Sequence, residues 1–153
     1  MNAMRSFFMF IARILIAAAF LFGGLHKWLA YDETVKYMAS VGFTAIPFFL
    51  IGASLVEVLG SIALILGFKT RIAAAILAIF LIPTTIIFHA FWNLGGVDQQ
   101  MAMMEFTKNL SIMGGLLYVI CNGSGGMSCD AFCGGCCKKK EPVVTKETDK
   151  TAQ

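Results

Sequence analysis

The chain has 153 residues, of which 58% are hydrophobic and only 14% are charged. Ordinary soluble domains carry about 25% charged residues, so this composition excludes a typical soluble enzyme and predicts an integral membrane protein. The formal net charge is +3, and many of the lysines lie near the C-terminus, beside an apolar segment. This position favours a membrane surface over nucleic acid as the partner of the positive charge.

Four apolar stretches are each near the roughly 20 residues that a helix needs to cross a bilayer. They cover residues 6–29, 46–67, 72–92 and 105–121. Continuous apolar runs can span only as helices, because every backbone polar group must be satisfied within the segment. We therefore expect an all-α, polytopic membrane protein. Residues 1–122 are expected to form a four-transmembrane-helix bundle, and residues 123–153 are expected to form a Gly-, Cys- and Lys-rich cytoplasmic tail that is largely disordered.

Lysine and arginine are unevenly distributed among the connections between these spans. Arg5, the 69–71 turn and the tail lysines fall on one side, whereas Lys36 falls on the other. The positive-inside rule then places both termini in the cytoplasm, with a bacterial inner membrane as the expected location. The connections 32–44 and 93–104 are expected as loops on the opposite side.

Ionisable residues inside the spans are the main functional hypothesis, because a charge at membrane depth is costly without a partner. Arg13 lies about two turns inside the first span, and Glu57 lies midway along the second. A guanidinium forks well onto a carboxylate, so Arg13 and Glu57 are predicted to form a buried ion pair. Lys27 follows Arg13 by about four turns and shares nearly the same helix face, which predicts a polar seam.

A second polar group is expected near the other edge of the membrane. It consists of His26, Lys27, His89, Trp92, Lys108 and Asn109. These residues are predicted to line a shallow pocket that is open to the bilayer. Packing alone is the alternative for the charges, and an interfacial belt position is the alternative for Trp92. A metal site from His26, His89 and Glu57 has little support, because no ligand-spacing motif is present.

Six short runs occur in the same order as in a known family. They are Arg13-Ile-Leu-Ile, Phe20-Leu-Phe-Gly-Gly-Leu-His-Lys27, Glu57-Val-Leu-Gly60, Gly67-Phe-Lys-Thr-Arg71, His89-Ala-Phe-Trp-Asn93 and Lys108-Asn-Leu-Ser-Ile-Met-Gly-Gly115. With these runs the chain resembles the DoxX family over residues 10–121. The resemblance implies a four-helix membrane protein with a link to redox chemistry, since one relative is the membrane subunit of a thiosulfate:quinone oxidoreductase. Others are associated with membrane complexes that handle oxidative or thiol stress.

A quinone is the ligand that suits this resemblance and these residues. Its headgroup needs hydrogen-bond donors and, on reduction, a source of protons. Lys27, His89, Trp92, Lys108 and Asn109 are the predicted quinone-binding residues, with Glu57 and His89 as a proton relay.

Electrons would have to come from elsewhere, because the spans contain no haem-attachment motif and no Gly-rich dinucleotide loop. We therefore expect a membrane subunit with other protein subunits as partners, which can also associate with copies of itself. The alternative is a non-enzymatic scaffold or transporter-like bundle whose buried charges serve only packing.

The tail carries a separate signal. Cys129, Cys133, Cys136 and Cys137 lie within nine residues and directly precede three lysines. Thiols at this density predict soft-metal binding or thiol redox chemistry. Their spacing fits no established metal motif, and acylation of a juxtamembrane anchor is the alternative.

Overall fold

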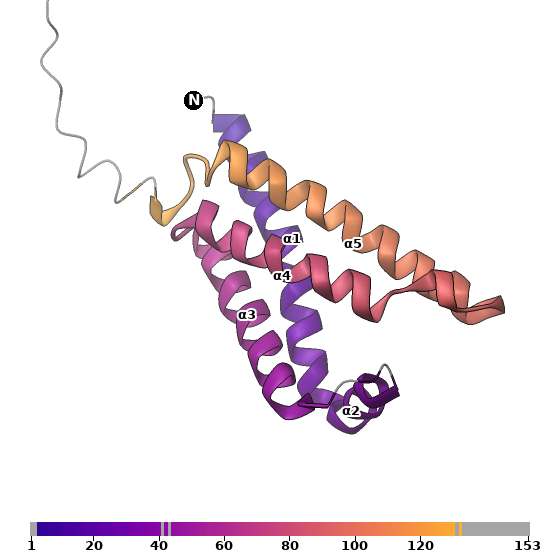
Figure 1. Ribbon diagram of the computed structural model, residues 1–153. Helices are drawn as coiled ribbons and strands as arrows, with labels where there is room; N and C mark the ends of the chain where they lie inside the picture. The colour runs from indigo at the N-terminus through magenta and orange to yellow at the C-terminus, as the bar shows by residue number, and fades with distance from the viewer. Residues whose placement is uncertain (1–2, 41, 43, 131, 133–153) are drawn as a thin grey trace, which may run out of the picture.

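The structure is a computed structural model that describes residues 3–40, 42, 44–130 and 132. Within these residues all regular structure is helical, in agreement with the predicted all-α class. The elements are α1 (Ala3–Leu29), α2 (Tyr31–Ser40), α3 (Ile46–Leu66), α4 (Thr70–Phe88), the short 3-10 helix η1 (Phe91–Asn93) and α5 (Gly96–Asn122), as shown in Figure 1.

Three segments of the described chain are long and apolar enough to cross a membrane: Ala3–Leu29, Ile46–Leu66 and Thr70–Asn93. Many large aliphatic side chains on these segments point outward, among them Leu15 and Ile79. Exposed leucine and isoleucine are expected where the surroundings are lipid rather than water. The chain is therefore a polytopic membrane protein.

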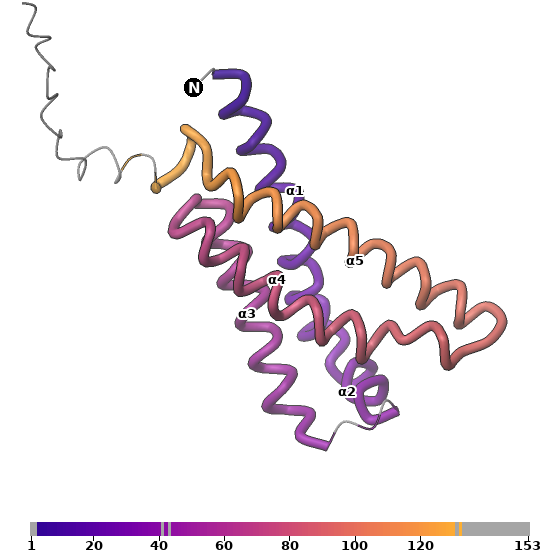
Figure 2. The backbone as a smooth tube through the Cα atoms, turned by 45° about the horizontal axis from the view of Figure 1, so that its top comes forward, coloured from indigo at the N-terminus to yellow at the C-terminus, as the bar shows by residue number. Residues whose placement is uncertain are grey.

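The helices pack as a chain of neighbouring pairs. The most extensive contacts join α1 with α3, α4 with α5 and α3 with α4. Their shared core consists of Ala17, Phe20, Leu64, Ala73, Ala74, Leu77, Ala78, Leu81, Leu116 and Val119. Small residues bring some helices close together. A Cβ atom on Gly115 of α5 would lie 2.9 Å from Cδ1 of Ile16 on α1. Figure 2 shows that the hairpin of α4 and α5 extends beyond the other helices at its η1 end.

Both expected loops are wrong as loops, because each contains helix. Residues 31–40 form α2, whose first turn carries Asp32 and Glu33, where acidic side chains favour the helix dipole. Met38 on α2 is buried. In addition, α5 begins at Gly96 rather than at residue 105. Both segments are too polar to be recognised from an apolar run alone.

The first and last helices meet at one end of the molecule, which we call the terminal end. The beginning of α1 and the end of α5 lie there (Figure 1). Arg5 Nη2 donates a hydrogen bond to Asn122 Oδ1 over 3.4 Å. The helix α2 lies at the opposite end of the molecule, so the two ends present different surfaces.

Candidate functional site

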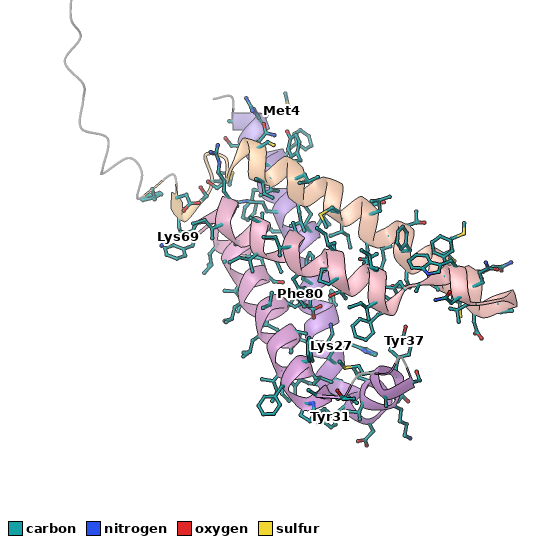
Figure 3. All side chains as sticks on the ribbon, in the orientation of Figure 1. Met4, Lys27, Tyr31, Tyr37, Lys69 and Phe80 are labelled. Carbon is teal, nitrogen blue, oxygen red and sulfur yellow. The ribbon has the colours of Figure 1, made fainter. Side chains whose placement is uncertain are left out.

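A cavity of about 640 Å³ lies between the helices in the half of the molecule that contains α2. All five α-helices contribute to its lining, and in Figure 3 the labelled Lys27, Tyr37 and Phe80 mark its α1, α2 and α4 walls. Most of the wall is apolar. The polar lining residues are His26, Lys27, Thr34, Tyr37, Glu57, Thr84, His89, Glu105, Lys108 and Asn109. Its size and its few polar groups are typical of small-molecule sites.

An ion pair between α1 and α3 forms part of this wall. Lys27 Nζ lies 2.5 Å from Glu57 Oε2 and also donates to the Gly23 carbonyl over 3.3 Å. The Glu57 side chain is 7% exposed and that of Lys27 is 26% exposed. Each group therefore neutralises a charge that would be costly alone in an apolar environment.

The predicted Arg13–Glu57 pair was wrong, because Glu57 pairs with Lys27. Arg13 is buried, at 1% exposure, but its Nη2 donates to the Met127 carbonyl over 2.5 Å. A Cβ atom on Gly67 would lie only 2.3 Å from Arg13 Nη1, so Arg13 lies beside the end of α3. Glu57 lies ten residues earlier, about 15 Å along the helix. The sequence correctly placed Arg13 and Lys27 on the face of α1 that meets α3. It did not give the correct position of Glu57 along the helix axis relative to these two residues.

Five of the six residues of the predicted outer cluster lie around the cavity. They are His26, Lys27, His89, Lys108 and Asn109. Trp92 does not line it. Instead, the exposed Trp92 packs edge-on against Phe91 and Phe106, with ring centroids 5.4 and 6.3 Å apart. The roles in quinone binding and proton relay remain predictions.

Tyr37 and Glu105 are cavity residues that the sequence did not indicate. The Tyr37 hydroxyl donates to the Phe88 carbonyl and so joins α2 to the end of α4. Burial, and then the nearby Glu105 carboxylate, raise the pKa of Tyr37, which keeps this hydroxyl a donor. Glu105 forms an ion pair with Lys108 one turn later. For Glu105 the only signal in the sequence was its spacing of three residues from Lys108, which places both on one face of a helix. Tyr37 lies in a segment that was expected to be a loop.

Residues 123–130 fold back against the terminal end, and we call this segment the clasp. Asp130 caps the N-terminus of α4. Its carboxylate accepts hydrogen bonds from the Lys69 amide, the Thr70 amide and the Thr70 hydroxyl, at 2.7, 2.9 and 2.8 Å. The Asp130 amide donates to the Gly67 carbonyl over 2.9 Å. The first part of the predicted tail is therefore packed against the bundle.

Of the four tail cysteines, Cys129 lies within the described residues. Cys129 is exposed within the clasp, whereas Cys133, Cys136 and Cys137 lie outside the described residues. In the part of the chain that the structure describes, no group of three or more His, Cys, Asp or Glu side chains is arranged to hold a metal ion. The metal or thiol chemistry of these cysteines remains a prediction.

The cap formed by Asp130 gives the clasp a defined pH dependence. Burial raises the pKa of Asp130, but the hydrogen bonds from Thr70 and Lys69 outweigh this effect and lower the pKa below the ordinary value of an aspartate. A carboxylate whose pKa is lower in the folded than in the unfolded protein stabilises the fold at any pH above its pKa in the unfolded protein. This stabilisation is lost as the pH falls through the pKa that the carboxylate has in the folded protein. We expect Asp130→Ala to weaken the clasp by about 1 kcal/mol at neutral pH.

Hydrogen exchange of residues 123–130 measures this effect. The wild type should lose the same protection only below about pH 4. The matched control is Asp98→Ala, which removes an exposed first-turn carboxylate from α5 and should leave the clasp unchanged. Equal exchange in wild type and Asp130→Ala at neutral pH would contradict the capping role.

Comparison with known proteins shows that the chain is similar to a family of membrane proteins. The family model described as DoxX matches residues 8–90. Inner membrane protein YphA of Escherichia coli is 35% identical over 129 residues, which cover 84% of this chain and 92% of YphA. Inner membrane protein YqjF of the same organism is 36% identical over 121 residues, which cover 78% of this chain and 87% of YqjF. No solved structure matches.

The family model covers more than half of the chain and includes nearly all of α1 and the whole of α2, α3 and α4. It therefore contains Lys27, Glu57 and His89, three of the polar residues around the cavity. The two bacterial relatives extend the similarity over most of both chains. The chain belongs to the DoxX family of integral membrane proteins.

Proposed function

We propose that this DoxX-family protein is a redox-linked membrane subunit that binds a quinone in the cavity between its five helices. The observation that carries the proposal is the cavity of about 640 Å³, which combines an apolar wall with His89, Asn109 and paired lysines. An isoprenoid quinone matches this combination, because its tail is apolar and its headgroup accepts hydrogen bonds. His89 and Asn109 are the proposed headgroup contacts, and Glu57 with His89 is the proposed proton relay.

The charges of the cavity favour a neutral ligand over a sulfur anion. Its lining contains two lysines and two glutamates, and each lysine forms an ion pair with one of the glutamates. A thiosulfate-like anion would have to break one of these pairs to obtain a countercharge. A quinone only needs donors, so its binding leaves both pairs intact.

The membrane arrangement is part of the proposal. We propose four membrane-spanning helices, with α5 as the fourth, and both termini in the cytoplasm of a bacterial inner membrane. The start of α1 and the end of α5 lie at the same end of the molecule, as an even number of spans requires (Figure 1). Arg5, Lys69 and Arg71 are also at this end, in line with the positive-inside rule.

Quinone titration of the purified protein tests the binding site. His89→Ala is expected to weaken binding of decylubiquinone about 3- to 10-fold, the usual effect of one lost hydrogen bond. Bound quinone can be measured by extraction and absorbance after removal of the free ligand. Trp92→Ala is the control, because Trp92 is a nearby exposed ring outside the cavity. Unchanged affinity in His89→Ala and in Asn109→Ala would contradict the proposed headgroup contacts.

A scaffold or transporter-like bundle is the second candidate, and the paired state of both cavity lysines supports it. In that case the ion pairs serve packing, and no redox activity depends on the cavity. Quinone reduction in native membranes separates the two functions. His89→Ala would lower the rate in a redox-linked subunit, and it would leave the rate unchanged in a scaffold that accumulates to the same level.

A further inference from the structure

A second hollow, of about 490 Å³, lies at the terminal end of the molecule and is separate from the cavity. It lies where the α3–α4 turn meets the end of α5 and the clasp. Its polar lining includes Lys69, Thr70, Arg71, Asn122 and Asp130. None of the residues that line it lines the cavity.

The side chains around this hollow carry an excess of positive charge. Lys69 and Arg71 line it and are exposed, and Arg5 reaches its rim through the hydrogen bond to Asn122. Asp130 is the acidic residue of the described lining. Its carboxylate, which accepts three hydrogen bonds from the Lys69 amide and from Thr70, offsets one of these positive charges, and the cations around the hollow remain in excess.

Arg71, one of the two lining cations, is held in place by contacts with the end of α5 and with the clasp. Arg71 Nη2 donates to the Cys121 carbonyl over 3.3 Å, at the end of α5. A Cβ atom on Gly123 would lie 3.2 Å from Arg71 Nε, so the clasp passes directly over this guanidinium. Lys69 precedes α4 in a left-handed conformation with φ of 43°.

The hollow lies where the apolar outer surface of the bundle gives way to charge. Phe68 and Ile72 flank Lys69 and Arg71 in the chain, and they are 54% and 56% exposed. Exposed apolar side chains in a membrane protein face lipid tails, whereas Lys and Arg beside them reach the headgroup level. Basic pockets between helices at this level are suited to anionic headgroups.

We propose that this hollow binds the phosphate of an anionic phospholipid headgroup, with Lys69 and Arg71 as its principal cations. Arg5 adds charge at the rim. The acyl chains would lie against the exposed Phe68 and Ile72. The bound lipid would connect the α3–α4 turn to the end of α5, two parts of the chain that the clasp also joins.

Native mass spectrometry of the full chain in mild detergent tests this site. Phosphatidylglycerol and phosphatidylcholine with identical acyl chains are titrated separately, and bound lipid is counted. The wild type should prefer phosphatidylglycerol. The double variant Lys69→Asn, Arg71→Gln should bind it about 30-fold more weakly, as expected for two lost cations at a membrane surface. Asparagine is chosen at position 69 because it tolerates the left-handed conformation.

The control is Lys36→Gln, which removes an exposed lysine from α2 at the opposite end and should keep the preference. Equal binding of the two lipids by the wild type would overturn the proposal, whatever the stability of the variants. Unchanged phosphatidylglycerol binding in a folded double variant would also overturn it. Displacement of the lipid by inorganic phosphate would replace a lipid site with a site for soluble anions, and it would refute the assignment.

Discussion

Replacement of Lys27 by methionine is expected to destabilise the protein by about 3–5 kcal/mol, the usual effect of leaving a buried charge without its partner. The Glu57 carboxylate would then be isolated, with its side chain only 7% exposed. Glu57→Gln should cost less, because the Lys27 side chain is 26% exposed and its ammonium can extend towards the headgroups. Unfolding by denaturing detergent, followed by circular dichroism, measures both variants.

The double variant Lys27→Met, Glu57→Met tests whether the two charges act as a pair. It should be more stable than Lys27→Met alone, because no uncompensated charge remains. Lower pH should partly rescue Lys27→Met, since a protonated carboxyl is less costly to bury. Lys36→Met, at an exposed position on α2, is the control and should be close to neutral. Additive losses in the double variant would contradict the pairing.

Replacement of Gly67 by alanine is expected to destabilise the protein by about 2–4 kcal/mol, from left-handed backbone strain and overpacking together. Gly67 has φ of 71°. An added Cβ atom would lie 2.3 Å from Arg13 Nη1 and 2.4 Å from the Ser128 Cβ. Either Arg13 or the clasp must move, so protease cleavage after residue 123 should become faster. Thermal unfolding and timed proteolysis measure the two effects.

Gly52→Ala, within α3, is the control for Gly67, which follows the last residue of that helix. An added Cβ atom at Gly52 meets no heavy atom within 4 Å, and alanine favours a helix over glycine. This variant should be neutral or slightly more stable, with wild-type cleavage of the clasp. Similar behaviour of Gly52→Ala and Gly67→Ala would show that the clasp does not pack against the α3–α4 turn.

The positions of three long helices, and the burial of Arg13 and Glu57, followed from local patterns. Apolar runs alone predicted α1, α3 and α4 within four residues of their observed ends. The same reasoning missed α2, because a helix of 10 residues with alternating polar and apolar faces has no long apolar run. It also began α5 too late, at the point where the sequence becomes apolar. The helix α5 packs against η1 and α4, and these contacts cannot be recognised from an apolar run in the sequence.

The cation that pairs with Glu57 shows the limit of reasoning from depth. Arg13 and Lys27 share a face of α1, and each is close to a group on the α3 side. Periodicity gives that shared face, but it does not give the level at which two helices align. In the antiparallel packing of α1 and α3, Gly24 lies against Glu57 and Arg13 lies beside Gly67. A shift of a few turns therefore decides which cation reaches the carboxylate.

The sequence by itself determined the class of protein, the main helices and the family, because these depend on apolar length, local charge and ordered motifs. It also singled out Arg13 and Glu57 as buried polar residues. Only the tertiary structure decided the Lys27–Glu57 pair, the cavity and the capping of α4 by Asp130 from about sixty residues away. The physical reason is that each of these features depends on the register between helices. That register is set by side-chain packing over the whole bundle and cannot be recognised from the periodicity of the sequence.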